Sequence, residues 1–283
     1  MKYIIITGVS SGIGLATAKL FTEKGHFVFG SVRTQTDADR LKNDLGDTFE
    51  PLIFDVSDAE NVKKAVKIVE NRVGTEGVSL LVNNAGIAVS GPLKHIDTAD
   101  IEHQFNINVF GVQRVTQAFL PLLGADLKTN ITGKGMIINV SSVSAYVTSP
   151  FLAPYSASKI AMEYLTDGLR RELSIYGIKV VIIEPGPVKT PIWDKAKTAV
   201  NYYPTTDYAA AVKDTEQNVS RIADKAIDVE IVATLIMKIY NMQKPSIRYI
   251  VGFNPLLIKF ISILPTRWVD ALLTRRLKKS ITK

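Results

Sequence analysis

The stretch that decides the fold reads Thr7-Gly8-Val9-Ser10-Ser11-Gly12-Ile13-Gly14 and directly follows the apolar run Tyr3 to Ile6. An amphipathic pattern comes next, so we expect a turn between a strand and a helix. Its glycines allow a tight turn and a close approach of the backbone to a ligand. The helix N-terminus presents free N–H groups and a partial positive charge, which suit a phosphate. A purely structural turn would also use glycines, so both interpretations stay open here.

Short β-branched runs alternate with amphipathic stretches along the rest of the chain. The expected strands are Tyr3 to Ile6, Phe27 to Val32, Pro51 to Phe54, Leu80 to Val82, Met136 to Val140, Lys179 to Ile183 and Arg248 to Val251. Helical patterns lie at about 12–24, 36–45, 58–73, 98–123, 154–176 and 225–241. This alternation predicts an α/β fold: a Rossmann-like, doubly wound sheet of seven parallel strands with helices on both faces. Such sheets bind ligands at the carboxyl ends of their strands.

Length and composition favour a single large domain. The chain has 283 residues, and 46% of them are hydrophobic, which is enough to bury a full core. We therefore expect residues 1–283 to form one domain. Residues 186–222 break the strand and helix rhythm and are expected to form a substrate loop, and residues 255–283 form a basic amphipathic extension.

The net charge of +7 is concentrated at the end of the chain. The last seventeen residues, from Arg267 on, hold six basic residues and one acidic residue. The body is nearly neutral, so we expect no binding of nucleic acid. The three histidines have no partner at metal-ligand spacing, and no metal is expected. Without cysteine there is no disulfide framework, and the first strand leaves no room for a signal peptide, so we expect a cytoplasmic protein.

Further motifs complete a resemblance to a known family. They are Asp55, Asn83-Asn84-Ala85-Gly86, Asn108, Ser142, Tyr155 with Lys159, and Pro185-Gly186. Together with the glycine spacing of residues 7–14, they resemble the short-chain dehydrogenase/reductase family over residues 3 to about 190. Residues 31–33 and the C-terminal extension resemble its hydroxysteroid and retinol dehydrogenase branch. The resemblance implies an NAD(P)-dependent oxidoreductase that transfers a hydride between a nicotinamide and a carbonyl or alcohol carbon.

Tyr155 and Lys159 stand four residues apart on a helical stretch, so both side chains lie on one face. A phenol has a pKa near 10. We expect the ammonium and the positive nicotinamide ring to lower that pKa and make Tyr155 the general acid/base. Tyr240 and Lys244 have the same spacing, but Pro245 follows them and no serine stands thirteen residues before Tyr240. We interpret this second pair as a coincidence.

Ser142 stands thirteen residues before Tyr155, the interval at which the family has its catalytic serine. It is expected to hydrogen-bond the substrate oxygen, although Ser141 and Ser144 are alternatives close by. The family's equivalent of Asn108 sits at a helix distortion and orders a water beside the lysine, so the resemblance implies that relay role here. Asparagine also caps or kinks helices for structural reasons, and the two roles are compatible.

The cofactor site is expected to draw on the glycine turn and on the segments after several strands. Its expected residues are Gly8, Ser10, Ser11, Gly12, Ile13, Gly14, Arg33, Asp55, Val56, Asn83, Ala85, Gly86, Tyr155, Lys159, Pro185, Gly186, Val188 and Thr190. No acidic residue directly follows the second strand to hold a ribose 2′-hydroxyl, whereas Arg33 suits a 2′-phosphate and Ser11 offers a further donor. NADP(H) is therefore favoured. NAD(H) is possible if Arg33 only stacks on adenine.

Apolar walls are expected around the substrate. The expected substrate contacts are Ser142, Val143, Tyr146, Phe151, Leu152, Pro187 and Trp193. Such a pocket suits a hydrophobic ketone or alcohol, steroid-like or retinoid-like, better than a sugar. Two other readings are a nucleotide-sugar epimerase or dehydratase, which usually has a different glycine spacing and a larger sugar domain, and a non-catalytic nicotinamide-binding sensor or scaffold.

The long helical patterns 98–123 and 154–176 carry apolar residues on more than one face, and the family usually pairs its subunits through them. A homodimer or homotetramer is therefore expected. The tail from Pro255 to Lys279 mixes apolar clusters with Lys and Arg. Contact with an anionic membrane surface is possible. A pair of helices that closes over the substrate cleft and has a solvated basic end is favoured over it.

Overall fold

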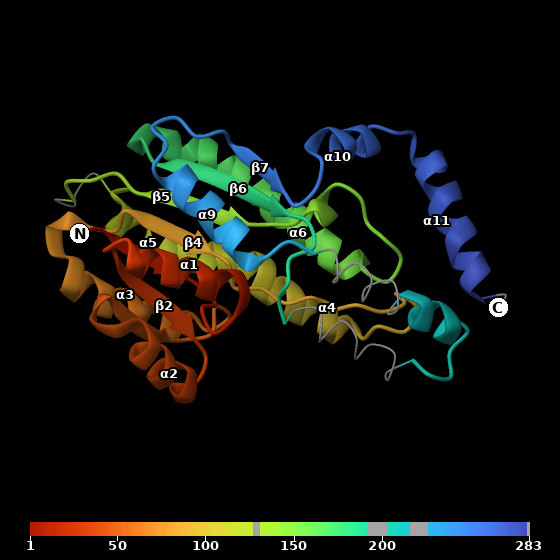
Figure 1. The fold of residues 1–283 in the computed structure, drawn as a ribbon, viewed down its shortest axis with the longest axis horizontal. Coiled ribbons are helices and arrows are strands. Elements are labelled where there is room, and N and C mark those ends of the chain that lie inside the picture. The colour runs from red at the N-terminus through yellow and green to blue at the C-terminus, as the bar shows by residue number, and fades with distance from the viewer. Residues whose placement is uncertain (127–130, 192–202, 216–225, 282–283) are drawn as a thin grey trace.

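A computed structural model describes residues 1–126, 131–191, 203–215 and 226–281. Its centre is a seven-stranded parallel sheet in the order β3-β2-β1-β4-β5-β6-β7 (Figure 1). The strands are β1 (Tyr3–Ile6), β2 (Phe27–Val32), β3 (Phe49–Ile53), β4 (Leu80–Asn83), β5 (Met136–Val140), β6 (Lys179–Pro185) and β7 (Arg248–Val251). The predicted fold class is confirmed.

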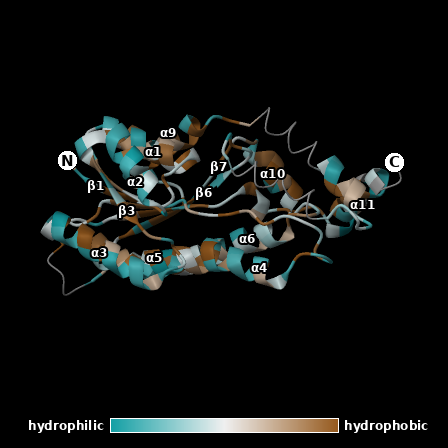
Figure 2. Cartoon of the chain, turned by 90° about the horizontal axis from the view of Figure 1, so that it is seen from below, coloured by the Kyte–Doolittle hydropathy of each residue, from teal (hydrophilic) through white to brown (hydrophobic). Residues whose placement is uncertain are grey.

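Helices cover both faces of this sheet. The helices on the two faces are α1 (Gly12–Glu23), α2 (Gln35–Leu45), α3 (Ala59–Val73), α4 (Thr98–Phe105), α5 (Val112–Phe119), α6 (Ala153–Glu172) and α9 (Val229–Tyr240). Two further helices, α10 (Pro255–Ser262) and α11 (Thr266–Ile281), lie beyond the end of the sheet (Figure 1). Figure 2 shows α1, α2 and α9 on one face and α3, α4, α5 and α6 on the other. Each face has its own core, because neighbouring residues of a strand point to opposite sides: Ile5 joins one core, and Ile4 and Ile6 join the other.

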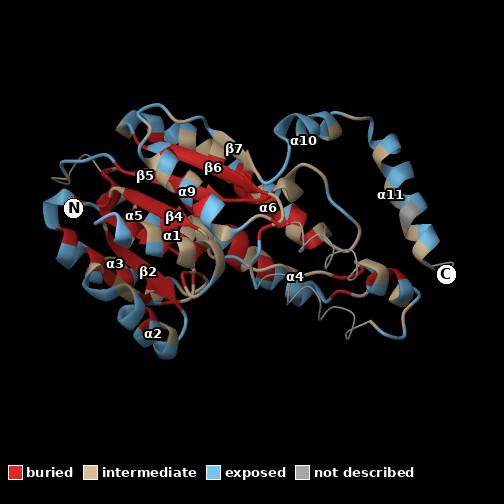
Figure 3. Cartoon of the chain, in the orientation of Figure 1, coloured by how far each residue is buried: buried red, intermediate tan, exposed pale blue. Residues whose placement is uncertain are grey.

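The inner strands β2, β1, β4, β5 and β6 are buried along most of their length, as expected for a parallel sheet covered on both faces, whereas the edge strands β3 and β7 are less buried (Figure 3). The third strand differs from its prediction, since it begins at Phe49 and ends at Ile53. Phe49 pairs with Val28 and is fully buried. Its ring fills the space beside Gly30, where an added Cβ would lie only 2.6 Å from Phe49 Cε2. The missing side chain at Gly30 therefore makes room for Phe49, and the strand begins two residues earlier than predicted.

The strand order reverses between β1 and β4, and the segments after these two strands are bonded together. Thr7 Oγ1 accepts hydrogen bonds from the backbone N–H groups of Asn84 (2.9 Å) and Ala85 (3.0 Å). The Asn84 amide donates to the carbonyl oxygens of Thr7 and Gly8. Ligands of doubly wound sheets bind at such a switch point. The fold therefore predicts a ligand site at this edge of the sheet.

The long helix predicted over 98–123 is interrupted. A π-helical turn, Asn106–Gly111, separates α4 from α5. At its end Gly111 lies against Val56, and an added Cβ would be 2.7 Å from Val56 Cγ2. Arg114 holds the turn from the next helix by donating to the Val56 carbonyl (2.6 Å) and to Asn106 Oδ1 (3.3 Å). The extra residue in this turn re-aims the side chains inside it.

Second apolar faces are present on these long helices, as the sequence indicated. Phe110 is 56% exposed and Tyr164 on α6 is 74% exposed, while Leu165 beside it is also exposed. Assembly into a homodimer or homotetramer through this surface stays a prediction.

We predict opposite effects of the same substitution at two helical glycines. Gly14→Ala should lower the free energy of unfolding by at least about 1–3 kcal/mol, because the new Cβ would lie 2.2 Å from the Gly8 carbonyl oxygen. Gly168→Ala, in the middle of α6 with nothing within 4 Å, should raise it by up to about 1 kcal/mol. Urea unfolding curves measure both values. Equal stability of the two variants would contradict the close packing at Gly14.

Candidate active site

The turn between β1 and α1 forms a cradle in which the glycines leave the backbone uncovered by side chains. Gly8 and Gly12 have φ angles of +71° and +61°, which favour glycine. The side chain of Ser11, the residue before α1, makes no capping hydrogen bond. The first amides of a helix have no partner inside the helix, so those of α1 are available to an acceptor in front of it. An anion with several oxygens, such as a pyrophosphate, fits this cradle.

The other expected cofactor residues line the same edge of the sheet. Thr190 lies next to the cradle, since a Cβ added at Gly12 would be 3.2 Å from Thr190 Cγ2. Asp55 Oδ1 accepts from the backbone N–H and the hydroxyl of Ser57. Asn83 is buried and its amide donates to Thr116 and Asn139, so its side chain is structural. The cradle and the segment after β6 thus lie against each other at Gly12 and Thr190, an arrangement that could hold the two ends of a dinucleotide.

Two arginines stand near the turn. Arg33, directly after β2, is exposed. Arg40 on α2 donates to the Ser10 carbonyl at 2.9 Å and to Asp37 at 2.8 Å. Sequence reasoning missed Arg40 because it follows β2 by eight residues. The available signal was the spacing of three residues between Asp37 and Arg40 on a helix. This spacing lets the first acidic residue after β2 pair with a cation.

The predicted catalytic residues meet at the carboxyl end of β5. Tyr155 and Lys159 come from the first turns of α6, and the Lys159 ammonium lies 5.7 Å from the centre of the Tyr155 ring. Ser142 follows β5 and hydrogen-bonds the Tyr155 side chain. Ser142 is 8% exposed and Lys159 7% exposed, so both lie in a site largely shielded from water.

The pKa of Tyr155 differs from the sequence prediction. Burial raises it above its usual value, and the hydrogen bond with Ser142 opposes this only in part. The expected lowering by Lys159 is absent because the ammonium faces the ring and donates to the Val140 carbonyl at 2.9 Å. In the protein without cofactor, Tyr155 is therefore a neutral phenol at pH 7.

The pKa of Lys159 is shifted as well. Burial lowers the pKa of Lys159 to about 8, and the negative charge of Glu163, one turn further along α6, acts in the opposite direction. Loss of hydration is thus the larger effect on the ammonium. Lys159 carries its charge near neutral pH and loses it within a short rise in pH.

Asn108 lies inside the π-helical turn and is almost fully buried. Its side-chain oxygen accepts from the Ile87 N–H, and its amide donates to the Ile87 carbonyl and to Ser158. A Cβ added at Gly86 would lie 3.2 Å from Asn108 Oδ1 and 3.8 Å from Lys159 Nζ. The missing side chain at Gly86 therefore leaves a space that borders both atoms.

The neighbours of Ser142 have other partners. Ser141 is buried and its hydroxyl donates to Glu163 Oε1 at 2.5 Å. The Ser144 backbone N–H donates to Ser142 Oγ at 3.1 Å, which fixes the Ser142 side chain. Of the three serines, Ser142 is the one that hydrogen-bonds Tyr155. The catalytic role of Ser142, in preference to Ser141 and Ser144, stays a prediction.

A buried ion cluster lies behind these residues, and sequence reasoning missed it. Arg248 on β7 pairs with Glu163, with Glu184 at 2.8 Å and with Asp167 at 3.0 Å. Glu163 and Glu184 are 4% and 0% exposed. The spacing of four between Lys159, Glu163 and Asp167 on one helix was the available signal. Removing one partner of such a cluster would leave uncompensated buried charge.

The expected substrate walls are half-buried, as residues beside an open cleft would be. They are Val143, Tyr146, Phe151, Leu152 and Pro187. The hydroxyl of Tyr146 donates to Glu184 at 3.0 Å, so it points into the ion cluster and its ring alone can serve as a wall. Trp193 lies outside the described residues.

Further aromatic residues contact these expected walls. The ring of Phe151 contacts Tyr208 edge-on, with centroids 5.9 Å apart, and Tyr208 in turn contacts His95. Asp207 binds Lys94 at 2.8 Å, which ties residues 203–215 to the loop after β4. The sequence indicated a loop over the cleft, but it did not reveal where the loop docks.

Comparison with known proteins fits this site. The family model described as short chain dehydrogenase matches residues 2–201. The NADPH-dependent 3-dehydrocapnine reductase of Ornithobacterium rhinotracheale is 42% identical over 280 residues, which are 99% of this chain and 98% of that protein. Retinol dehydrogenase 16 of Mus musculus is 33% identical over 96% of this chain and 87% of its own. The crystal structure of a short-chain dehydrogenase from Streptomyces avermitilis, 28% identical, aligns over 99% of this chain and 97% of its own with a TM-score of 0.77.

The chain therefore belongs to the short-chain dehydrogenase family, and it is an oxidoreductase. The resemblance that its motifs gave is confirmed.

We predict that Glu163→Gln lowers the pKa of Lys159 below its value of about 8, because it removes the negative charge that opposes the effect of burial. A ¹³C NMR titration of the lysine side chain measures this pKa. Asp167→Asn is the matched control, since Asp167 also binds Arg248 but does not act on Lys159. An equal shift in both variants would contradict the assignment.

This shift also predicts a dependence of stability on pH. The pKa of Lys159 is lower in the folded chain than the value of about 10.4 in the unfolded chain. The unfolded chain then binds more protons between those two values, so the contribution of Lys159 to the free energy of unfolding rises with pH from about 8 to about 10.4.

Proposed function

We propose that this oxidoreductase reduces a hydrophobic ketone with NADPH and that Tyr155 is its general acid. The observation that carries the proposal is the meeting of Ser142, Tyr155 and Lys159 beside the cradle of the glycine turn. When bound, NADPH supplies the hydride. The chain's own residues supply the proton and the orientation of the substrate.

Tyr155 is suited to proton donation in the reductive direction. Its raised pKa keeps the phenol protonated at neutral pH. Ser142 is a hydrogen-bond partner of that phenol and can hold the carbonyl oxygen against it. The charge of Lys159 stabilises the phenolate that remains after the proton has left. Above a pH of about 8, where Lys159 loses this charge, we expect reduction to slow.

Asn108 is proposed to serve the return of the proton to Tyr155. Its Oδ1 and the Lys159 ammonium border the space beside Gly86. A carbonyl oxygen has two lone pairs, and the Ile87 N–H occupies one of those on Asn108. A water in this space would accept from Lys159 and donate to Asn108, which opens a route for protons to solvent.

The proposed substrate class rests on the apolar and aromatic walls. The rings of Phe151 and Tyr208 contact each other, the ring of Tyr146 adds a third aromatic wall, and Val143, Leu152 and Pro187 are aliphatic. The relative with 42% identity is named as a reductase of 3-dehydrocapnine. Its name supports ketone reduction as the direction for this chain as well. Apolar walls with few polar groups favour a hydrophobic carbonyl compound over a sugar.

NADP(H) is proposed as the preferred cofactor. Arg33 is exposed directly after β2, and Arg40 approaches Ser10 within the turn. Asp37 is paired with Arg40, so this carboxylate is not free to repel a phosphate. The name of the bacterial relative, an NADPH-dependent reductase, supports the same preference.

Tyr155→Phe should reduce the rate of ketone reduction by at least about 100-fold, because the ring stays in place while the proton donor is lost. NADPH binding, measured by fluorescence titration, should persist. Tyr240→Phe is the control: its ring packs against Phe21 and His26, remote from the site, and its loss of a hydroxyl should leave turnover unchanged. Near-normal turnover of Tyr155→Phe would refute the proposed role.

Arg33→Asp should remove or invert the cofactor preference. A charge-assisted contact contributes about 1.5–3 kcal/mol, so the wild-type protein should prefer NADPH by roughly 10-fold to 150-fold. The introduced carboxylate would repel the 2′-phosphate. The KM values for NADPH and NADH, measured with any accepted ketone, give the ratio. Lys19→Asp, the same charge change at an exposed position of α1, should leave this ratio unmoved. If Arg33→Asp also leaves it unmoved, Arg33 does not recognise the phosphate.

A further inference from the structure

Helix α10 carries an apolar face that nothing in the described part of the chain covers. Its sequence is PLLIKFIS, and none of its eight residues is buried. Leu256, Phe260 and Ile263 are 77%, 57% and 77% exposed and follow each other at spacings of four and three. They therefore share one side of the helix. Exposure of several large apolar side chains side by side marks an interaction surface.

Helix α11 has an inner and an outer side. Its inner side holds Leu273 and Leu277, which are half-buried, and the Ser280 hydroxyl donates to Asp214 at 2.7 Å. This contact fastens the end of α11 to residues 209–215. The outer side holds Trp268 and Leu272, which are 68% and 71% exposed and lie one turn apart. Two helices that follow each other in the chain, α10 and α11, thus both carry exposed apolar side chains.

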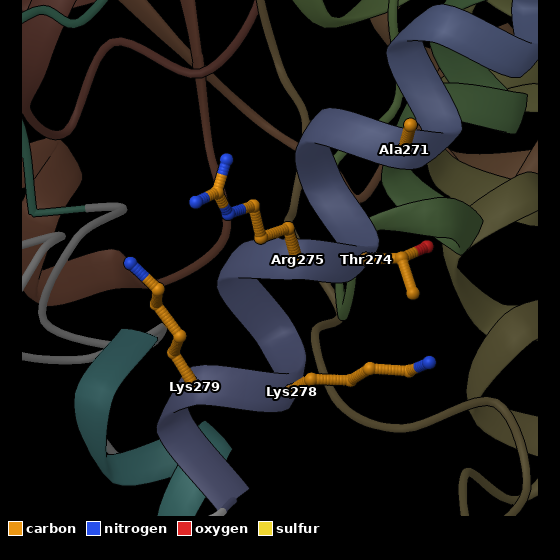
Figure 4. Close-up of a pocket in the computed structure, with 5 residues that line it drawn as sticks. All are labelled: Ala271, Thr274, Arg275, Lys278 and Lys279. Atoms are coloured by element: carbon orange, nitrogen blue, oxygen red, sulfur yellow. The ribbon is translucent and has the colours of Figure 1, made fainter.

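Cations surround this apolar surface. Arg275 and Lys279 continue the line of Trp268 and Leu272 at helical spacing and extend to one side of α11, while Lys278 extends to the other (Figure 4). Together with Ala271 and Thr274 they line a shallow hollow on the helix, remote from the catalytic residues. Lys259 lies on α10 among its apolar residues.

We propose that the outer face of α10 and α11 binds to the surface of a membrane that contains anionic lipids. Large apolar side chains combined with Lys and Arg are the composition of helices that lie in a lipid interface. No helix of the described residues is long and apolar enough to cross a membrane, so the attachment is peripheral.

A second copy of this chain fits the face less well. In a two-fold dimer the same patch meets itself. The cationic residues Lys259, Arg267, Arg275 and Lys279 would then lie opposite the same cationic patch of the second copy, with Asp270 as the acidic residue of α11. Like charges across such a contact repel, whereas anionic lipid headgroups attract all of them.

The position of α10 and α11 determines which edge of the enzyme would face the membrane. Helix α10 begins four residues after β7 ends, at the carboxyl edge of the sheet that also carries Ser142 and Tyr155. Phe253, in between, packs on Gly186 at the end of β6, where an added Cβ would lie 2.4 Å from its ring. Attachment through α10 and α11 therefore holds this edge of the enzyme near the lipid.

The test measures binding of the whole protein to vesicles by co-sedimentation. Vesicles of phosphatidylcholine are compared with vesicles that also contain phosphatidylglycerol. The wild-type protein should bind the anionic vesicles at least about tenfold more strongly, and high salt should weaken this binding. Lys259→Glu with Arg275→Glu and Lys279→Glu should abolish the preference. Phe260→Ser with Trp268→Ser should reduce binding to both kinds of vesicle.

Matched variants separate the proposed face from general surface properties. Lys63→Glu with Lys64→Glu and Lys67→Glu changes the same number of exposed charges on α3, and Ile68→Ser with Ile175→Ser removes two exposed apolar side chains elsewhere. Both controls should bind vesicles as the wild type does. Circular dichroism verifies that every variant is folded.

Three results would overturn the proposal: equal binding to both kinds of vesicle, equal loss in the α3 control, or no binding at all. A wild-type dimer in lipid-free solution that Phe260→Ser with Trp268→Ser converts to a monomer would show that a second copy covers the face. The proposal does not depend on the substrate, because vesicle binding is measured without turnover.

Discussion

The close approach of bare backbone segments at the start of α1 is the constraint on which the rest of the structure depends. At Gly14 the helix comes so near to Gly8 that a single methyl group would overlap the Gly8 carbonyl oxygen. The Asn84 side chain bonds the same carbonyl, so β1, β4 and α1 meet at one point. This contact fixes the point at which the carboxyl ends of β1 and β4 diverge. The cradle, the catalytic residues after β5 and the segment after β6 all take their places around that separation.

Burial is the second constraint on the site, and it shifts the pKa values of both Tyr155 and Lys159. It raises the pKa of Tyr155 and lowers that of Lys159, so the neutral form of each is favoured. The carboxylate of Glu163 offsets this for Lys159, and Arg248 holds that carboxylate in place. The charge of Lys159 near neutral pH therefore depends on Glu163 and Arg248, which lie behind the proposed catalytic residues.

The sequence was sufficient to predict the doubly wound parallel sheet, because strands and helices follow from local periodicity. It was also sufficient to predict that Ser142, Tyr155 and Lys159 lie together, because their spacing along the chain indicated it. It was insufficient where distant segments decide the outcome. The start of β3 depends on the space at Gly30, and the π-helical turn depends on the approach of Gly111 to Val56. The predicted fall in the pKa of Tyr155 was wrong for the protein alone, because spacing reveals that a cation is near but not how deeply the phenol is buried. The docking of Tyr208 on Phe151 likewise needed the folded chain.

The pairing of Arg248 with three carboxylates has a consequence for how this sequence can change over time. Glu163 and Asp167 come from α6, Glu184 from β6 and the guanidinium from β7, so one planar group joins three elements. A lysine at this position would offer a point charge in place of a fork with five donors. A neutral residue would leave two carboxylates buried without a counter-charge. These four positions are therefore expected to covary among descendants of this chain, and an isolated replacement at any one of them should be rare.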